Sequence, residues 1–422
     1  MIFTAAQLSA LPVLDTCDVL IAGGGVAGVA AALSAARAGA KVTLIEREYA
    51  LGGLATLGLI NFFVPMCNGR GRQIIFGMAE ELLRASIRYG YDSIPDEWKD
   101  GEPGEGAKTR YVTKYSANIF AMVLMEMIVD EGAALMLDSV VSKPVMKGGH
   151  CEGLIVENKS GREFYAGKMI VDATGDGDVM HRAGMPTVQG KNFFTYCAQG
   201  IDMAHIRKAA ETGRVCDAIF GISGGGATLH GLNQPKGMRL FDGTTAEDVT
   251  EYIVRNQKKL MEKLKAQDRW ERDVALLPGM PQFRTTRHLE GDYVLKGDDR
   301  YRHFDDSIAA LNDFEFRDWL YELPFRALVK TGYDNIIAAG RCASAEGWAW
   351  DVIRVIPPAI LSGQAAGVAC AQAIDAACAI HDLPVEPLQK QLEQDDMLIH
   401  FDDALVPADE TQAVNGAEKD HM

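Results

Sequence analysis

The residues near the amino terminus that are best suited to chemistry form a glycine-rich turn followed by an acid. Gly23, Gly25 and Gly28 have the spacing G-x-G-x-x-G, and Glu46 follows at the end of the next apolar run. Gly23 permits a tight turn, Gly25 lets a pyrophosphate approach the backbone, and Gly28 allows close packing of a helix on a sheet. The Glu46 carboxylate can accept hydrogen bonds from ribose hydroxyls. The pattern predicts a dinucleotide-binding site.

Short apolar runs around this turn predict the elements that must position it. Residues 18–22 and 41–45 are typical of buried strands, and the alanine-rich residues 29–37 are typical of a helix. The order strand, turn, helix, strand is a βαβ unit, in which the helix presents unpaired N–H groups and a partial positive charge to phosphates. The alternative is a glycine-rich turn that binds nothing. That alternative explains the turn but not the acid at this spacing.

Two later stretches are also suited to a nucleotide. Residues 51–56 are rich in glycine and would run along a diphosphate, although a plain surface turn is the alternative. A predicted strand at 168–171 runs into residues 172–178, where Ala-Thr-Gly allows a second close backbone approach. The three aspartates of 172–178 could instead form a calcium loop, but Ala183 stands where such a loop has its glutamate.

Three basic side chains lie close together in residues 281–296. They are Arg284, Arg287 and His288, and they fit either a salt-bridged strand or a wall that binds an anion or carbonyl. In a strand, Arg284 and His288 would share one face and Arg287 would lie on the other. A neighbouring arginine would lower the pKa of His288, which would suit a neutral base near pH 7.

The pattern of strand and helix returns near the carboxyl terminus. Residues 335–341 predict a buried strand that ends in glycine, and Pro357-Pro358 precede a long helix rich in alanine and glycine. Proline is favourable in a first helical turn, because its missing N–H would be unpaired there. Between these elements, Trp348 and Trp350 either line a pocket or pack in the core.

Composition restricts the classes of function. A chain of 422 residues predicts two or three structural units, and a formal charge of −16 argues against nucleic acid as a partner. The eight cysteines include no C-x-x-C pair, so we expect reduced thiols and no metal site. The first residues lack a signal-peptide pattern, and residues 359–380 predict an internal helix rather than a membrane span. We therefore expect a cytoplasmic protein with no membrane partner.

The order of these stretches resembles the glutathione-reductase-like FAD fold. The closer resemblance is to the FAD-dependent oxidoreductases related to fumarate reductase flavoproteins, and it covers most of the chain. The last two of the matching stretches are the more specific to that family. These stretches are 23–28 with Glu46, 52–56 with 71–73, 172–178, 284–293, and 323–326 through 340–342 to 354–357.

The resemblance implies an α/β fold with a Rossmann-like FAD-binding domain, made of a parallel sheet and a β-meander, and an inserted α+β substrate domain. Residues 15–184, with an inserted loop at 91–110, would form the first part of the FAD-binding domain. Residues 185–330 would form the substrate or cap domain, in which the glycine-rich residues 220–231 are expected to be a loop. Residues 331–401 would complete the FAD-binding domain, and 402–422 would be a flexible acidic tail.

The resemblance also implies how FAD is held in an extended form. Glu46 would bind the adenosine ribose beside Arg47, and Val141 would meet the adenine through its backbone. The helix after Pro358 would point its amino end at the flavin pyrimidine, with help from Arg354. The expected FAD-binding residues are Gly23, Gly25, Val26, Ala27, Gly28, Glu46, Arg47, Gly53, Leu54, Ala55, Thr56, Val141, Ala173, Thr174, Gly175, Asp178, Gly340, Arg341, Arg354, Pro358 and Ala359.

The expected activity is transfer of a hydride between flavin N5 and a small polar substrate, carbohydrate-like or an organic acid. His288 is the candidate acid or base, Arg284 and Arg287 would orient the substrate, and Tyr115 and Asp351 are weaker candidates. Residues 343–351 lack the histidine that many relatives carry after Gly-Arg-Cys, so the substrate chemistry is expected to differ.

Two other classes of function fit the same motifs. The first is a thiazole-synthase-like or NAD-only dinucleotide-binding enzyme, which would carry no bound flavin. The second is an FAD-binding protein that is non-catalytic or associated with RNA modification, although the charge of −16 argues against RNA. The electron acceptor is unknown at this stage, and a homo-oligomer is left open.

Overall fold

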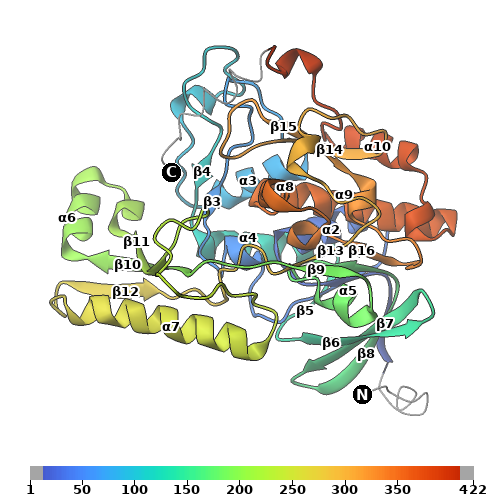
Figure 1. The fold of residues 1–422 in the computed structure, drawn as a ribbon, viewed down its shortest axis with the longest axis horizontal. Helices are drawn as coiled ribbons and strands as arrows, with labels where there is room; N and C mark the ends of the chain where they lie inside the picture. Colours follow the sequence, from blue (N-terminus) through green and yellow to red (C-terminus); the bar gives the residue numbers. More distant parts are fainter. Residues whose placement is uncertain (1–12, 409–422) are drawn as a thin grey trace.

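The computed structural model describes residues 13–408 and is built around a seven-stranded sheet (Figure 1). The strand order is β5-β2-β1-β8-β7-β6, and β16 pairs with the end of β8. Strands β5, β2, β1, β8 and β16 are parallel, while β8, β7 and β6 form an antiparallel meander. The predicted parallel sheet with a β-meander is therefore confirmed. The strands are β1 (Val13–Ala22), β2 (Val42–Ile45), β5 (Ala134–Met136), β6 (Val140–Lys147), β7 (His150–Asn158), β8 (Gly161–Asp172) and β16 (Ile336–Ala338).

Two helices rich in small residues pack closely on this sheet. Helix α2 (Val26–Arg37) follows the glycine-rich turn, and α9 (Ile356–Ala376) lies directly against it. A Cβ at Gly363 would lie 2.1 Å from the carbonyl oxygen of Ala27. Only glycine fits at such a crossing, which explains the composition of α9 without a membrane. Among residues 13–408, no single helix is long and apolar enough to cross a bilayer; α8 (Gly347–Ile353) and α9 reach that length only together, across a bend of 77°.

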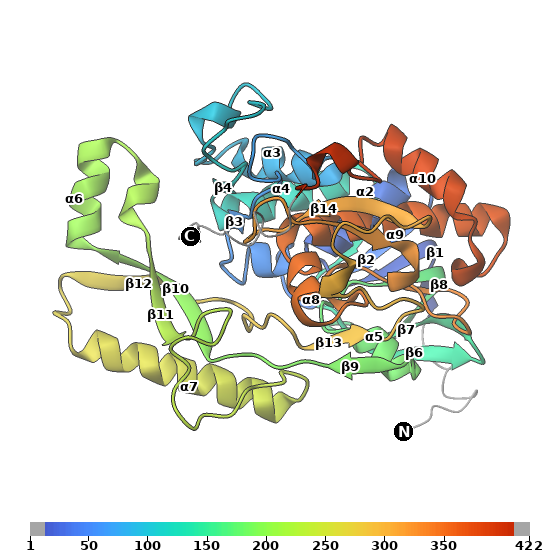
Figure 2. The same cartoon turned by 45° about the horizontal axis from the view of Figure 1, so that its top comes forward.

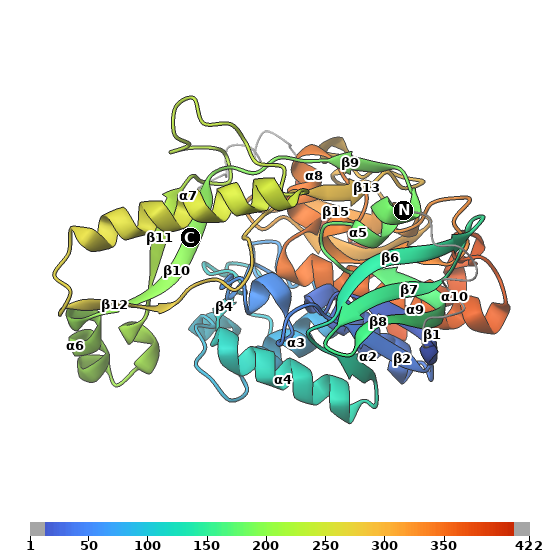
Figure 3. The same cartoon turned by 90° about the horizontal axis from the view of Figure 1, so that it is seen from below.

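A second unit of strands and helices is inserted after the Rossmann-like part, and it extends to one side of the molecule (Figure 2). Its three-stranded sheet has the order β11-β10-β12, and α7 lies along β11 (Figure 3). Tyr196 and Ala198 of β10 pack against Leu260 and Leu264 of α7 to form a separate small core. The unit comprises β10 (Thr195–Asp202), α6 (Met203–Thr212), β11 (Phe220–Gly226), α7 (Ala246–Lys265) and β12 (Arg272–Leu276).

The glycine-rich residues 220–226 form strand β11, so the expectation of a loop there is wrong. A Cβ at Gly224 would lie 2.5 Å from the carbonyl oxygen of Asn256 in α7, and one at Gly225 would lie 2.3 Å from that of Phe194. The Asn256 side chain accepts a hydrogen bond from the Gly225 backbone at 2.7 Å. The glycines therefore allow helix-to-strand contact rather than chain mobility.

The inserted core ends earlier than residue 330. Residues of β14 (Ser307–Asn312) and β15 (Leu320–Pro324), such as Ile308 and Leu323, belong to the main hydrophobic core together with α2 and α9. Residues 295–329 therefore pack with the part built on the seven-stranded sheet, whereas they were predicted to belong to the substrate domain of residues 185–330.

Two segments expected to be exposed are partly packed. In the 91–110 loop, Trp98 is buried and stacks on Tyr111 with ring centroids 5.1 Å apart. At the start of the expected tail, a short 3₁₀ turn at Asp403–Leu405 leads to Val406, and both Leu405 and Val406 pack on a small apolar cluster. The rest of that tail, residues 409–422, lies outside the described residues.

The remaining elements complete the layers around the sheet. They are β3 (Phe62–Phe63), α3 (Met78–Ile87), β4 (Thr113–Lys114), α4 (Ala117–Asp130), α5 (Asp178–Ala183), β9 (Thr187–Gln189), β13 (Arg287–Leu289) and α10 (Val385–Gln394).

Candidate functional site

A cavity lies at the carboxyl ends of the parallel strands, where the three nucleotide-type stretches meet. It encloses about 1220 Å³ of empty space, counting the part open to solvent. Most of the residues expected to bind FAD line it, although they come from opposite ends of the chain. They are Gly23, Gly25, Val26, Ala27, Glu46, Arg47, Gly53, Leu54, Ala55, Val141, Ala173, Thr174, Gly175, Asp178, Gly340, Arg341, Arg354 and Ala359.

The three glycines of the turn have different surroundings. Gly23 has φ +102°, and a Cβ there would lie 2.5 Å from the carbonyl oxygen of Ala173. A Cβ at Gly28 would lie 1.8 Å from the carbonyl oxygen of Gly23, so this glycine serves the packing of α2 and does not line the cavity. A Cβ at Gly25 would meet no atom within 4 Å. The packing of the protein therefore does not require glycine at position 25. A ligand that touches the backbone there would require it, because a side chain would occupy the ligand's space.

Glu46 is held in the cavity wall by the backbone. Its Oε2 accepts a hydrogen bond from the Gly24 N–H at 2.5 Å, and its Oε1 accepts one from the Glu48 N–H at 2.9 Å. Burial raises the pKa of Glu46, and these backbone hydrogen bonds oppose that shift. Each carboxylate oxygen keeps a further lone pair for a hydroxyl group.

The loop at 51–56 is fixed from behind by two hydroxyl groups. Thr56 Oγ1 donates to the Leu51 carbonyl at 2.5 Å, and Tyr115 Oη donates to the Ala55 carbonyl at 2.9 Å. Tyr115 is fully buried, and neither it nor Thr56 lines the cavity. The two side chains hold the loop in place from outside the cavity lining.

The aspartates of residues 172–178 are all engaged by the protein. Asp172, whose pKa is raised by burial, accepts hydrogen bonds from the backbones of Thr174 and Met180. Asp176 Oδ1 pairs with the Arg341 guanidinium at 2.5 Å, and Asp178 Oδ1 pairs with Arg287 at 3.1 Å. The carboxylates therefore point to separate partners rather than to a common centre, which disfavours a calcium loop.

Arg287 and His288 lie in β13, which pairs with β9, but Arg284 precedes the strand. The expected alternation of Arg284 and His288 on one face therefore does not apply. Arg287 is buried and ties β13 to the loop of Asp176 and Asp178. Arg287 therefore links β13 to the loop that lines the cavity.

His288 is packed inside the protein. It is 2% exposed, its Nδ1 lies 2.7 Å from the Leu289 carbonyl oxygen, and its ring meets Trp350 edge-on at 4.5 Å. A carbonyl only accepts hydrogen bonds, so Nδ1 carries the proton. The pKa of His288 is lowered, as expected, but by burial rather than by a neighbouring arginine. His288 does not line the cavity.

Arg354 brings a positive charge to the cavity wall, and a second positive charge, that of Arg284, lies close to it. Arg354 lines the cavity and pairs with Asp351, whose Oδ1 lies 2.7 Å from Nε. Burial and the nearby charge of Arg354 lower the pKa of Arg284. The Arg284 guanidinium donates to Thr195 Oγ1 at 3.4 Å, and no ion pair to a carboxylate is found for it within residues 13–408.

The inserted unit meets the nucleotide-binding part along residues 57–61. Gln282 Nε2 donates to the Gly58 carbonyl at 2.7 Å, and the Gly279 N–H donates to the Leu57 carbonyl at 2.8 Å. Between these contacts, Met280 lines the cavity.

Both tryptophans near the carboxyl terminus are held by hydrogen bonds. Trp350 Nε1 donates to the Arg341 carbonyl at 2.8 Å, and Trp348 Nε1 donates to Asp313 Oδ2 at 2.5 Å. Burial raises the pKa of Asp313 to about 6. Neither indole lines the cavity, so of the two alternatives the structure favours packing.

Several lining residues were not expected from the sequence. Ser139 and Val140 precede the expected Val141, and Arg182 reaches the same strand by donating to the Val141 carbonyl at 2.9 Å. Pro358, by contrast, was expected but does not line the cavity. The unexpected lining residues are Ile45, Glu48, Gly52, Ser139, Val140, Arg182, Met280, Ala339 and Ile356. Most of these residues lie close in sequence to residues that were expected to bind FAD. Met280 does not, and no sequence motif marks the loop that contains it.

Comparison with protein families gives one match that covers most of the chain. The model of the family described as FAD dependent oxidoreductase matches residues 18–217 and 227–392. The comparison with curated proteins gives no match.

Solved structures similar to this chain share little sequence with it. A geranylgeranyl bacteriochlorophyll reductase-like protein from Thermoplasma acidophilum is 13% identical over 96% of this chain and 97% of its own, with a TM-score of 0.46. The myxobacterial chondrochloren halogenase CndH is 15% identical over 90% and 79%, with a TM-score of 0.45. The p-nitrophenol 4-monooxygenase PnpA from Pseudomonas putida DLL-E4 is 12% identical over 93% and 91%, with a TM-score of 0.43. Likeness at this level carries no inference about substrate or reaction.

Proposed function

The chain belongs to the FAD dependent oxidoreductase family, and from this premise we propose that it transfers a hydride between a small organic acid and N5 of its FAD. FAD is the cofactor of the family, and when bound it supplies the two-electron chemistry. The observation that carries the choice of an organic acid is Arg284, a partly buried cation near Arg354 of the cavity wall; Arg284 has no carboxylate partner among the described residues.

The residues that line the cavity fit an extended FAD. Gly25 leaves open space at the amino end of α2, where unpaired N–H groups attract a pyrophosphate. Glu46 is fixed by two backbone N–H groups and keeps acceptor capacity for ribose hydroxyls. Ile356 and Ala359, in the first turn of α9, line the other end, so that helix directs its amino end to the cavity. This arrangement supports the cofactor positions expected from the sequence.

Arg284 would hold the substrate through its carboxylate. Partial burial of a guanidinium without a carboxylate partner is costly, and a bound carboxylate would compensate its charge with two parallel hydrogen bonds. Thr195 orients the guanidinium, and the Asp351–Arg354 pair keeps a second cation beside it. Arg287 and Arg341 are already paired with aspartates, so they are poor candidates for an anion.

His288 is better suited to positioning than to proton transfer. A general base must come within hydrogen-bonding reach of the proton it removes, whereas His288 is buried behind Trp350 and outside the cavity lining. We assign it the role of supporting Trp350, which in turn holds the Arg341 carbonyl. The substrate proton would then leave to water or to another group of the cavity.

Anaerobic mixing of the purified holoenzyme with organic acids and matched neutral sugars would test the proposal. We expect an acid to bleach the visible flavin band, and we expect Arg284→Gln to raise the acid concentration needed for half-maximal bleaching at least tenfold. The flavin content of the variant should stay normal, because Arg284 does not line the FAD cavity. Bleaching by neutral sugars that is equally fast in Arg284→Gln would refute an organic-acid substrate.

A further inference from the structure

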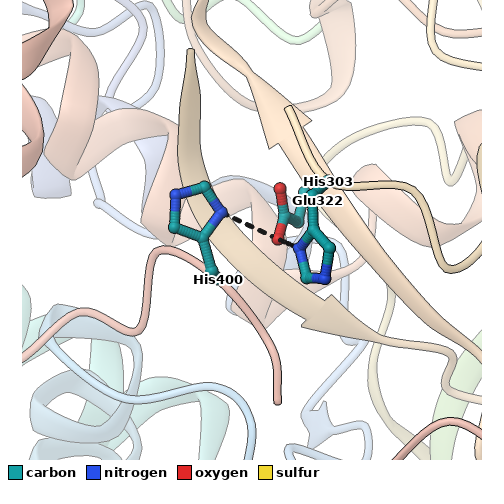
Figure 4. Close-up of side chains that lie close together, drawn as sticks. All are labelled: His303, Glu322 and His400. Atoms are coloured by element: carbon teal, nitrogen blue, oxygen red, sulfur yellow. Dashed lines mark hydrogen bonds and ion pairs between the residues drawn. The ribbon is translucent and has the colours of Figure 1, made fainter. Parts of the chain in front are cut away.

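A cluster of two histidines and a glutamate lies outside the FAD cavity. His303 precedes β14, Glu322 lies within β15, and His400 follows α10 (Figure 4). One ligand atom from each residue falls within 4.8 Å of the other two. None of the three lines the FAD cavity, and none takes part in the proposed reaction.

Glu322 is the centre of the cluster. Its side chain is 0% exposed, and its Oε1 lies 2.6 Å from Nδ1 of His303 and 3.0 Å from Nδ1 of His400. Its Oε2 accepts a hydrogen bond from the Phe304 N–H at 2.8 Å. A buried carboxylate in the middle of a strand is destabilising unless a positive charge compensates it. The compensating group must lie on the Oε1 side, where the two imidazoles converge.

The outer groups of the cluster are arranged as they are around bound metals. The Nε2 atom of His303 faces Oδ1 of Asp403 at 2.9 Å, on the side away from Glu322. Histidine ligands of metals typically donate their other ring N–H to a carboxylate in this way, and carboxylate ligands are themselves hydrogen-bonded. Asp403 and the Phe304 N–H supply these two outer contacts. This is an observation independent of the convergence of the three ligand atoms.

We propose that Nδ1 of His303, Nδ1 of His400 and Oε1 of Glu322 bind a divalent transition-metal ion of the zinc class. Two imidazoles and one carboxylate, with a water in the fourth position, are a common zinc ligand set, whereas calcium and magnesium prefer oxygen ligands. On binding, the ion displaces the protons that Nδ1 of each histidine now shares with Glu322. Both histidines are exposed, so an ion can reach them.

The sequence predicts no metal site, because its eight cysteines include no closely spaced pair. Here His303 lies 19 residues from Glu322, and His400 lies 78 residues from it, so no spacing motif exists. An ion at this position would tie residues 400–403 to the β14–β15 hairpin. Because these ligands come together only in the folded chain, the ion binds the folded state in preference to the unfolded state and should therefore raise the unfolding temperature.

Zinc titration of untagged, full-length holoenzyme tests the site. After treatment with a chelator, we expect one zinc ion to bind per chain, the unfolding temperature to rise, and the chelator to reverse the rise. His400→Gln removes one exposed ligand and should weaken zinc binding at least tenfold. Asp403→Ala removes only the outer carboxylate and should weaken it about 10- to 100-fold.

His205→Gln is the matched control. His205 is another partly exposed histidine beside a single carboxylate, with Nδ1 2.8 Å from Asp202 Oδ1, but no second histidine joins it. Its variant should bind zinc as the parent does, and FAD content checks the fold of all three variants. Absence of a one-to-one zinc complex in the parent, or equal zinc affinity in His400→Gln and the parent, would overturn the proposal.

Discussion

Gly25 offers the sharpest test of the cofactor site, because the structure separates its role from that of Gly28. The backbone at Gly25 has φ −63° and ψ 174°, which alanine adopts without strain, and a Cβ would meet no protein atom within 4 Å. Gly25→Ala therefore places a methyl group in the cavity and leaves the protein packing unchanged. We expect a loss of FAD binding without a loss of fold.

The magnitude follows from the contacts that the methyl group would prevent. Losing one charge-assisted hydrogen bond to the pyrophosphate costs roughly 1.5–3 kcal/mol, which corresponds to a roughly 10- to 150-fold weaker FAD affinity. In the apoprotein, alanine reduces the entropy of the unfolded chain, worth about 0.4–1 kcal/mol. Alanine is also a poorer N-cap than glycine, which costs a comparable amount. The net change in apoprotein stability should lie within about 0.5 kcal/mol of zero.

Two measurements on the same samples test this reasoning. Flavin fluorescence titration of apoprotein gives the FAD affinity, and denaturant unfolding of apoprotein gives the stability. Gly28→Ala is the matched control: its Cβ would lie 1.8 Å from the Gly23 carbonyl oxygen, so it should destabilise the apoprotein by about 1–3 kcal/mol or more. The reasoning fails if Gly25→Ala binds FAD as tightly as the parent, or if its apoprotein is as unstable as that of Gly28→Ala.

Four further predictions follow from single contacts. Glu46→Ala should weaken FAD binding and also destabilise the apoprotein, since it removes two backbone hydrogen bonds, whereas loss of FAD affinity alone would contradict the observed role of Glu46 in the fold. Arg287→Ala should lower the unfolding free energy by roughly 1.5–3 kcal/mol, because it removes the hydrogen bonds of the buried guanidinium to the Asp176 carbonyl and the Asp178 carboxylate; additivity with Asp178→Asn in a double-mutant cycle would disprove the pairing. His288→Gln should slow substrate-driven flavin reduction less than tenfold, against the roughly 10²–10⁴-fold expected for a general base, as measured by stopped-flow bleaching. Because burial lowers the pKa of His288, the unfolded chain takes up its proton first, so the unfolding free energy should fall below about pH 6.5 and fall less in His288→Gln.

The nucleotide-binding part could be predicted because its signals are local. Gly28 must be glycine because of a contact with Gly23 inside one βαβ unit, and an acid at the end of the next strand completes the local pattern, although the contact of Gly23 with Ala173 reaches a later strand. The prediction that residue 340 reaches the same cavity depended on the family resemblance. No local pattern of the sequence shows that β16 pairs with β8.

The inserted unit and the polar residues near it could not be predicted in the same way. Three consecutive glycines in β11 indicated a loop, because Asn256 of α7 and Phe194, which leave no room for a Cβ at Gly224 and Gly225, lie far from them along the chain. Arg287 and His288 looked alike as site candidates, because their spacing does not show which aspartates or aromatic rings they will meet. The cluster of His303, Glu322 and His400 could not be predicted for the same reason. Its three residues approach one another only after β14, β15 and the segment beyond α10 have packed.

The ion pairs around residues 175–178 also explain why Arg284 is the remaining candidate for the substrate. Asp176 binds both Arg341 and Thr286, and Asp178 binds Arg287. These contacts attach the chain that leaves the inserted unit to the loop that lines the cofactor cavity, and they pair Arg287 with an aspartate but leave Arg284 without one. A substrate carboxylate would therefore meet the one arginine of residues 281–290 that the protein has not already paired.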